Sequence, residues 1–90
     1  MSILNRIKLL PKGYVEVLFQ KKKYGVTRDD FNEGKSIKVY AKELAGNDVI
    51  SLNYYITSEK ELLKPCEMPN QKVIQFLNNF KLIEDESHLE

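Results

Sequence analysis

The chain has 90 residues, of which 42% are hydrophobic and 30% are charged. A chain of this size builds one domain with a single core, and its hydrophobic content excludes the composition of a disordered protein. Fourteen basic and thirteen acidic residues leave a formal net charge of +1. This balance provides no overall field that would select a nucleic acid or a membrane surface, and no apolar run approaches the length of a membrane span.

The chain contains one cysteine, Cys66, which excludes an internal disulfide and favours a reducing compartment, so we expect a cytoplasmic protein. The N-terminal residues 1–7 lack the uninterrupted apolar stretch of a signal peptide. The final Leu89-Glu90 is typical of a vector-derived junction before a purification tag. We expect a single α+β domain over residues 1–83 and a disordered tail over residues 84–90.

The first part of the chain predicts a helix followed by two strands. Apolar residues at helical spacing indicate a helix over residues 2–10, which ends before Pro11. Alternating apolar residues predict strands over residues 14–20 and 23–27, with Lys21-Lys22 as the turn between them.

The polar segment 28–34 predicts one helical turn. Asp29 or Asp30 would cap this turn, Phe31 would pack beneath the sheet, and Gly34 would close it in a left-handed conformation. We therefore expect a short helical connection before the third strand.

Residues 35–56 predict a β-hairpin about a Gly46-Asn47 turn. In that register Ile37 pairs with Ile56 and the apolar pairs collect on one face, because side chains alternate along a strand. The opposite face pairs polar with aromatic or polar residues: Lys38 with Tyr55, Tyr40 with Asn53, and Lys42 with Ser51.

Residues 57–69 show no regular pattern, and Pro69 is expected to begin a C-terminal helix with an apolar stripe. The expected fold is α+β, a four-stranded antiparallel meander with N- and C-terminal helices packed on one face. The expected core between sheet and C-terminal helix consists of Ile37, Val39, Leu52, Tyr54, Ile56, Val73, Ile74, Leu77 and Phe80.

Two sequence motifs resemble functional sites, but neither has the neighbouring residues and elements that its function requires. Gly34-Lys35-Ser36 resembles the end of a phosphate-binding loop, but that loop needs a glycine where Asp29 stands and a helix where a strand is predicted. The acidic residues Asp29, Asp30 and Glu33 suit helix capping, because one short turn does not supply the six to eight oxygen ligands of calcium. We therefore expect no metal site and no cofactor.

Cys66 is a weak candidate for a catalytic thiol. It lies beside Lys64 and near the predicted start of a helix, which is the kind of position where reactive cysteines occur. The alternative is a small half-buried residue that packs the loop onto the sheet, as free cysteines commonly do. We favour the packing role, so that an enzyme is the second interpretation.

The outward face of the sheet is the stronger candidate site. The residues expected there as a binding face are Tyr14, Lys38, Tyr40, Lys42, Asn53 and Tyr55. Aromatic residues are favoured at the centre of protein interfaces, so this face predicts a protein partner or a homodimer. Aromatic residues interleaved with lysines also suit single-stranded nucleic acid, which is the third interpretation because the net charge is close to zero.

Several segments carry a resemblance to a known family: Gly34-Lys35-Ser36-Ile37-Lys38-Val39-Tyr40-Ala41, Gly46-Asn47-Asp48, Asn53-Tyr54-Tyr55, and Leu62-Leu63-Lys64-Pro65-Cys66-Glu67-Met68-Pro69. Over residues 11–80 the chain resembles a family of short uncharacterised bacterial proteins, some of which carry the name peptide methionine sulfoxide reductase. The resemblance implies a bacterial, cytoplasmic protein. One class of reductases has Gly-Cys-Phe-Trp at its nucleophile, whereas Pro65 and Glu67 flank Cys66, so the resemblance transfers no catalytic residue.

Overall fold

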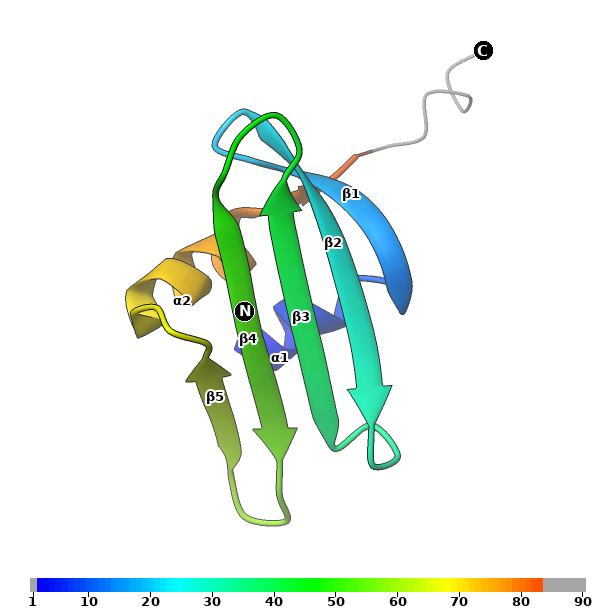
Figure 1. Ribbon diagram of the computed structural model, residues 1–90. Helices are drawn as coiled ribbons and strands as arrows, with labels where there is room; N and C mark the ends of the chain where they lie inside the picture. The colour runs from blue at the N-terminus through cyan, green and yellow to red at the C-terminus, as the bar shows by residue number, and fades with distance from the viewer. Residues whose placement is uncertain (1, 84–90) are drawn as a thin grey trace.

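The computed structural model describes residues 2–83, so the tail predicted over residues 84–90 lies outside the described residues. Residues 2–83 form one antiparallel six-stranded sheet, with the strand order β5-β4-β3-β2-β1-β6, and two helices (Figure 1). The elements are α1 Ile3–Lys8, β1 Gly13–Phe19, β2 Lys22–Phe31, β3 Ser36–Glu43, β4 Val49–Ile56, β5 Glu61–Pro65, α2 Asn70–Asn79 and β6 Lys81–Leu82. The α+β class is as predicted, whereas the prediction of four strands is wrong.

Both helices lie on one face of the sheet, which we call the covered face (Figure 1). Seven of the nine residues expected in the core are buried there, and Ile56 and Ile74 are partly buried against them. Phe76 of α2 packs against Phe19 and Tyr24 of the sheet, with ring centroids 5.1 and 5.6 Å apart. The sequence-based core is therefore confirmed, and α2 supplies much of its cover.

The short helix α1 is held by its contacts with α2. Ser2 caps α1 by accepting a hydrogen bond from the Asn5 backbone N–H. The Arg6 guanidinium donates to the backbone carbonyls of Leu77 and Phe80, at the end of α2, and lies 4.3 Å from the centre of the Phe80 ring. Within residues 2–83 no helix combines the length and the apolar character that crossing a membrane requires.

The two strands that the sequence did not predict lie at the edges of the sheet. β5 pairs with β4 through Leu63 opposite Tyr54, although residues 57–69 were expected to be irregular. Its residues are half-buried or exposed in no alternating order, and Pro65 ends it, as suits an edge strand. β6 has two residues and pairs with Val17 and Leu18 of β1.

The helical turn predicted over residues 28–34 is also wrong, because β2 continues to Phe31. Arg28 and Asp30 are two residues apart on the covered face, where the guanidinium donates two hydrogen bonds of 2.9 Å to the carboxylate. A third Arg28 hydrogen bond, 2.6 Å long, ends on the buried Leu10 carbonyl. Phe31 is exposed rather than packed beneath the sheet. The polar residues Arg28 and Asp30, which predict a turn, thus form hydrogen bonds with each other inside a strand.

The β3–β4 hairpin forms, but its register differs from the prediction by two residues. Ile37 pairs with Tyr54, Val39 with Leu52 and Lys38 with Asn53, and the loop runs over residues 44–48 instead of the two residues Gly46-Asn47. The Glu43 N–H donates to the Asp48 carbonyl and closes this loop. Because the shift is an even number of residues, every side chain keeps its predicted face.

The β1–β2 turn lies one residue earlier than predicted. Gln20 and Lys21 form it, both in the left-handed region with φ of 54° and 66°. Left-handed residues at both central positions match the right-handed twist of a two-residue hairpin. The shift places Lys22 at the start of β2, opposite Phe19.

Candidate binding face

The uncovered side of the sheet, which we call the outer face, gathers all six residues predicted as a binding face. The strand register places Lys38 directly opposite Asn53, and it aligns Tyr14, Thr27 and Tyr40 across three strands. The outer face consists of Tyr14, Glu16, Leu18, Lys23, Gly25, Thr27, Asp29, Phe31, Ser36, Lys38, Tyr40, Lys42, Val49, Ser51, Asn53, Tyr55, Leu62 and Lys64. No helix of residues 2–83 covers it (Figure 1).

Four aromatic side chains of the outer face are open to solvent. Tyr14 is 60% exposed, Phe31 53%, Tyr40 40% and Tyr55 37%. Tyr24 and Tyr54, by contrast, are buried on the covered face. Phe31 was expected beneath the sheet, so it is a member of this face that was not predicted. The sequence signal for its true position is the alternation of side chains along β2, which continues through Arg28 and Asp30 on the covered face to Phe31 on the outer face.

Tyr14 lies over a glycine of the neighbouring strand. A methyl group added at Gly25 would stand 2.5 Å from the Tyr14 hydroxyl and 3.1 Å from Leu44 Cδ2. The ring therefore occupies space that only glycine leaves free. The Tyr14 hydroxyl donates to Glu16 Oε2 over 3.4 Å, and partial desolvation, followed by the Glu16 charge, raises the pKa of the phenol. Gly25 thus fixes where one aromatic group of the outer face lies.

The outer face has more positive than negative charge. It contains four lysines and the two acids Glu16 and Asp29. Its lysines are Lys23, Lys38, Lys42 and Lys64. All four ion pairs found within residues 2–83 involve other side chains. The ammonium groups of this face are therefore available to an external anion.

Cys66 lies at the margin of the outer face. Its backbone N–H donates to the Ser51 carbonyl, and its Sγ accepts a hydrogen bond of 3.6 Å from Asn53 Nδ2. The side chain is half-buried. The two candidate sites, Cys66 and the sheet face, are therefore neighbours through Asn53. This proximity was not expected, because the pairing of β5 with β4 was not predicted.

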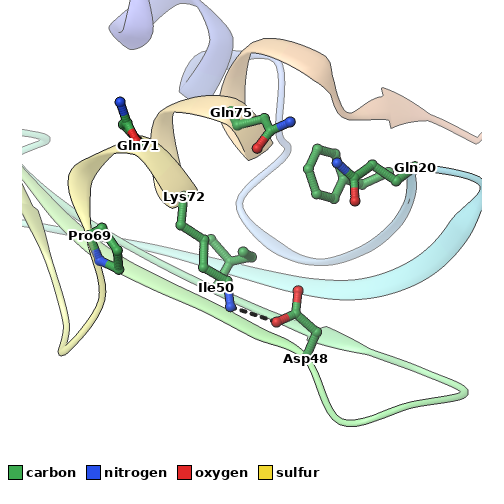
Figure 2. Close-up of a pocket in the computed structure, with 8 residues that line it drawn as sticks. Gln20, Asp48, Ile50, Pro69, Gln71, Lys72 and Gln75 are labelled. Atoms are coloured by element: carbon green, nitrogen blue, oxygen red, sulfur yellow. Dashed lines mark hydrogen bonds and ion pairs between the residues drawn. The ribbon is translucent and has the colours of Figure 1, made fainter.

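A cleft of about 390 Å³ lies elsewhere, between α2, the Gln20-Lys21 turn and the start of β4. Figure 2 shows Lys72 extending from α2 to Asp48, whose carboxylate is 2.6 Å from Lys72 Nζ. The buried Tyr24 hydroxyl donates to the other oxygen of Asp48 over 2.8 Å. The Lys72 hydrogen bond is the main cause that lowers the pKa of Asp48, and burial, then Asp48, raise the pKa of Tyr24. The charged groups in this cleft are thus paired with each other.

Comparisons with known proteins identify no relative. No protein-family model matches the chain, and neither the curated proteins nor the solved structures contain a match. Within residues 2–83 no group of three or more histidine, cysteine or acidic side chains could hold a metal ion. The geometry of the outer face therefore carries the functional argument.

Proposed function

We propose that the protein is a non-enzymatic binding module that receives a macromolecular partner on its outer face. One observation carries the proposal: both helices cover the same side of a six-stranded sheet, and the other side displays four aromatic side chains, each more than one third exposed. Exposed aromatic groups that lie together are characteristic of interaction surfaces. The single cysteine supports a reducing, cytoplasmic setting for this interaction.

The shape and rigidity of the face favour a large partner. Strands β1 to β5 form a continuous ladder, so the backbone beneath these side chains is fixed before any partner binds. Tyrosine also loses little conformational entropy on binding, because it has two side-chain torsions. An extended surface of this kind offers contact area, whereas the cleft near α2 has its charges paired.

An NMR titration of ¹⁵N-labelled protein tests the proposal. The labelled chain is diluted in steps and is separately titrated with oligonucleotides and with acidic and neutral peptides. We expect chemical shift changes that map to the strands around Tyr40 and Tyr55. Shift changes that map only to the α2 cleft, or none in any series, would refute the proposal.

The double variant Tyr40→Ser with Tyr55→Ser provides the matched control. Both side chains point away from the core, so the variant keeps its fold and loses the binding response, because a few aromatic anchors carry most of the energy of an interface. Leu9→Ser, which removes an exposed apolar side chain of the α1 C-cap, should bind like the parent protein. A double variant that binds with unchanged affinity would show that the outer face is not the site.

A further inference from the structure

We propose that the partner of the outer face is single-stranded nucleic acid, an inference that rests on the function proposed above. Base-stacking side chains, phosphate-binding cations and a polar side chain for base edges lie together on this face. The residues concerned are Tyr40, Tyr55, Lys38, Lys64 and Asn53. Single-strand binders combine these three kinds of group.

The spacing of the two central tyrosines suits successive stacking sites. Tyr40 stands opposite Ser51, four residues along β4 from Tyr55. With a rise of about 3.4 Å per residue, the two tyrosines are roughly 14 Å apart along the strands. Between them lies the cross-strand row of Asp29, Lys38, Asn53 and Lys64. Two stacking platforms thus flank a row of two cations and one amide, with a carboxylate at the β2 end.

The charge of the outer face differs from that of the whole chain, which is +1. Four lysines stand against Glu16 and Asp29 on this face, a local excess of two positive charges. Three other acids, Asp30, Glu43 and Asp48, form ion pairs away from the outer face. The local excess of positive charge favours a polyanion on this face.

The same lysines disfavour a protein partner or a second copy of the chain. Lysine is depleted at the centre of protein interfaces. Duplexes are disfavoured as well, because stacking on tyrosine requires bases that are not already stacked within a helix.

The chain contains no tryptophan, so its intrinsic fluorescence comes from tyrosine and can report stacking directly. The experiment titrates the protein with an oligothymidylate and an oligouridylate of about ten nucleotides, within the range of site sizes of single-strand binders. The controls are a duplex of the same length and a polyglutamate of matched charge. We expect quenching and saturable binding with the single strands, and much weaker binding with both controls.

Two variants at one position separate stacking from general apolar contact. Tyr40→Leu should weaken oligothymidylate binding by roughly 5- to 150-fold, the equivalent of one lost base stack. Tyr40→Phe keeps the ring and should bind within a few-fold of the parent protein. Equal binding by the Leu and Phe variants would overturn the inference, because it would show that the ring is not used for stacking.

Salt dependence tests the lysines. For single strands, log K falls against log salt concentration with a slope of about −0.7 for each phosphate neutralised. Lys38→Gln and Lys64→Gln should each make the slope shallower by about 0.7, whereas the change Lys8→Gln, at an exposed lysine on α1, should leave it unchanged. Equal effects of all three changes would mean diffuse attraction rather than a site and would overturn the inference.

The outcomes keep the two proposals separate. Shift changes on the outer face with polyglutamate, with a peptide or on self-association, but not with single strands, would overturn the nucleic-acid inference and leave the binding module standing. Oligonucleotide binding that maps away from the outer face would overturn the nucleic-acid inference, and it would refute both proposals if no other titration or dilution shifts the outer face.

Discussion

The hydroxyl of Tyr54 on β4 donates a hydrogen bond to Glu61, the first residue of β5, so a buried phenol ties down the edge strand. Tyr54 also stands opposite Leu63 in the same strand pair. Burial, followed by the Glu61 hydrogen bond, raises the pKa of Tyr54 to about 12. This contact explains how a five-residue edge strand with an irregular sequence is held in the sheet.

Tyr54→Phe should lower the free energy of unfolding by about 0.5–1.5 kcal/mol, the usual net value of one hydrogen bond. Urea denaturation measures this change. Tyr55→Phe, on the outer face, is the matched control and should change stability by less than about 0.5 kcal/mol. Equal effects at both positions would contradict the role of the Glu61 contact.

The same phenol makes stability depend on alkaline pH. The pKa of Tyr54 in the folded state is about 12, above the ordinary tyrosine value of 10.0, so the unfolded chain loses this proton first as the pH rises. The contribution of Tyr54 is therefore complete below pH 10 and is lost between pH 10 and 12. The free energy of unfolding, measured across this pH interval, should fall less steeply in Tyr54→Phe than in the parent protein. If the free energy of unfolding has the same pH dependence in both proteins, the raised pKa of Tyr54 is contradicted.

Leu77 tests the packing of α2. Its side chain is fully buried in the core, so Leu77→Ala should cost roughly 2–5 kcal/mol in denaturant unfolding. Gln75→Ala, on the exposed side of the same helix, should cost less than about 0.5 kcal/mol. A cost at Leu77 as small as that at Gln75 would mean that the helix does not cover the sheet as described.

Asp48 and Lys72 should contribute unequally to stability. Asp48→Ala removes the acceptor of the buried Tyr24 hydroxyl and should cost about 1–3 kcal/mol, the penalty for an unsatisfied buried polar group. Lys72→Met removes one partner of a partly exposed ion pair and should cost less than about 1 kcal/mol. Thermal denaturation of both variants checks the order, and a larger loss at Lys72 would contradict it.

Asp48 also gives a dependence on acidic pH. Its pKa in the folded state is lowered from 3.8, so its contribution is complete above the unfolded value and is lost as the pH falls below it through the folded value. In this acidic range the free energy of unfolding of Asp48→Asn should fall less steeply than that of the parent protein. A parent-like acid transition in that variant would contradict the assignment.

Cys66 should behave as a packing residue. Its thiol is half-buried and accepts a hydrogen bond from Asn53, so alkylation at pH 7 should be much slower in the native protein than after unfolding in urea. Cys66→Ala should mainly reduce stability. Rapid alkylation of the native protein, together with methionine sulfoxide reduction that Cys66→Ser abolishes, would support a thiol-dependent enzyme instead.

The side-chain alternation of the central strands could be predicted from the sequence, because it needs no knowledge of the register. Ile37 and Val39 face the core, and Lys38 and Tyr40 face outward, in both the predicted and the observed pairing. The register itself depends on the loop over residues 44–48. That loop is held by Asp48, whose partners Tyr24 and Lys72 are distant in the sequence. The sequence pattern of a single hairpin contains no information about those distant contacts.

The other errors have the same origin. Arg28 and Asp30 predicted a turn because each is polar, and only the folded chain shows that they neutralise each other against the Leu10 carbonyl. β5 lies at an edge, where half-burial removes the alternation that marks a strand. The central residues of the outer face were therefore predicted from the sequence. The place of Phe31 on this face and the position of Cys66 at its margin were not.

The strand order has a consequence for synthesis of the chain on the ribosome. The chain leaves the sheet at one edge through β5 and returns at the opposite edge as β6, after α2 has packed against the covered face. Strands β1 to β4 can therefore pair while Val73, Phe76 and Leu77 are still inside the exit tunnel. Until those residues emerge, the nascent hairpins present an apolar surface that only α1 can cover, so the final quarter of the chain decides whether this surface meets its own helix or another molecule.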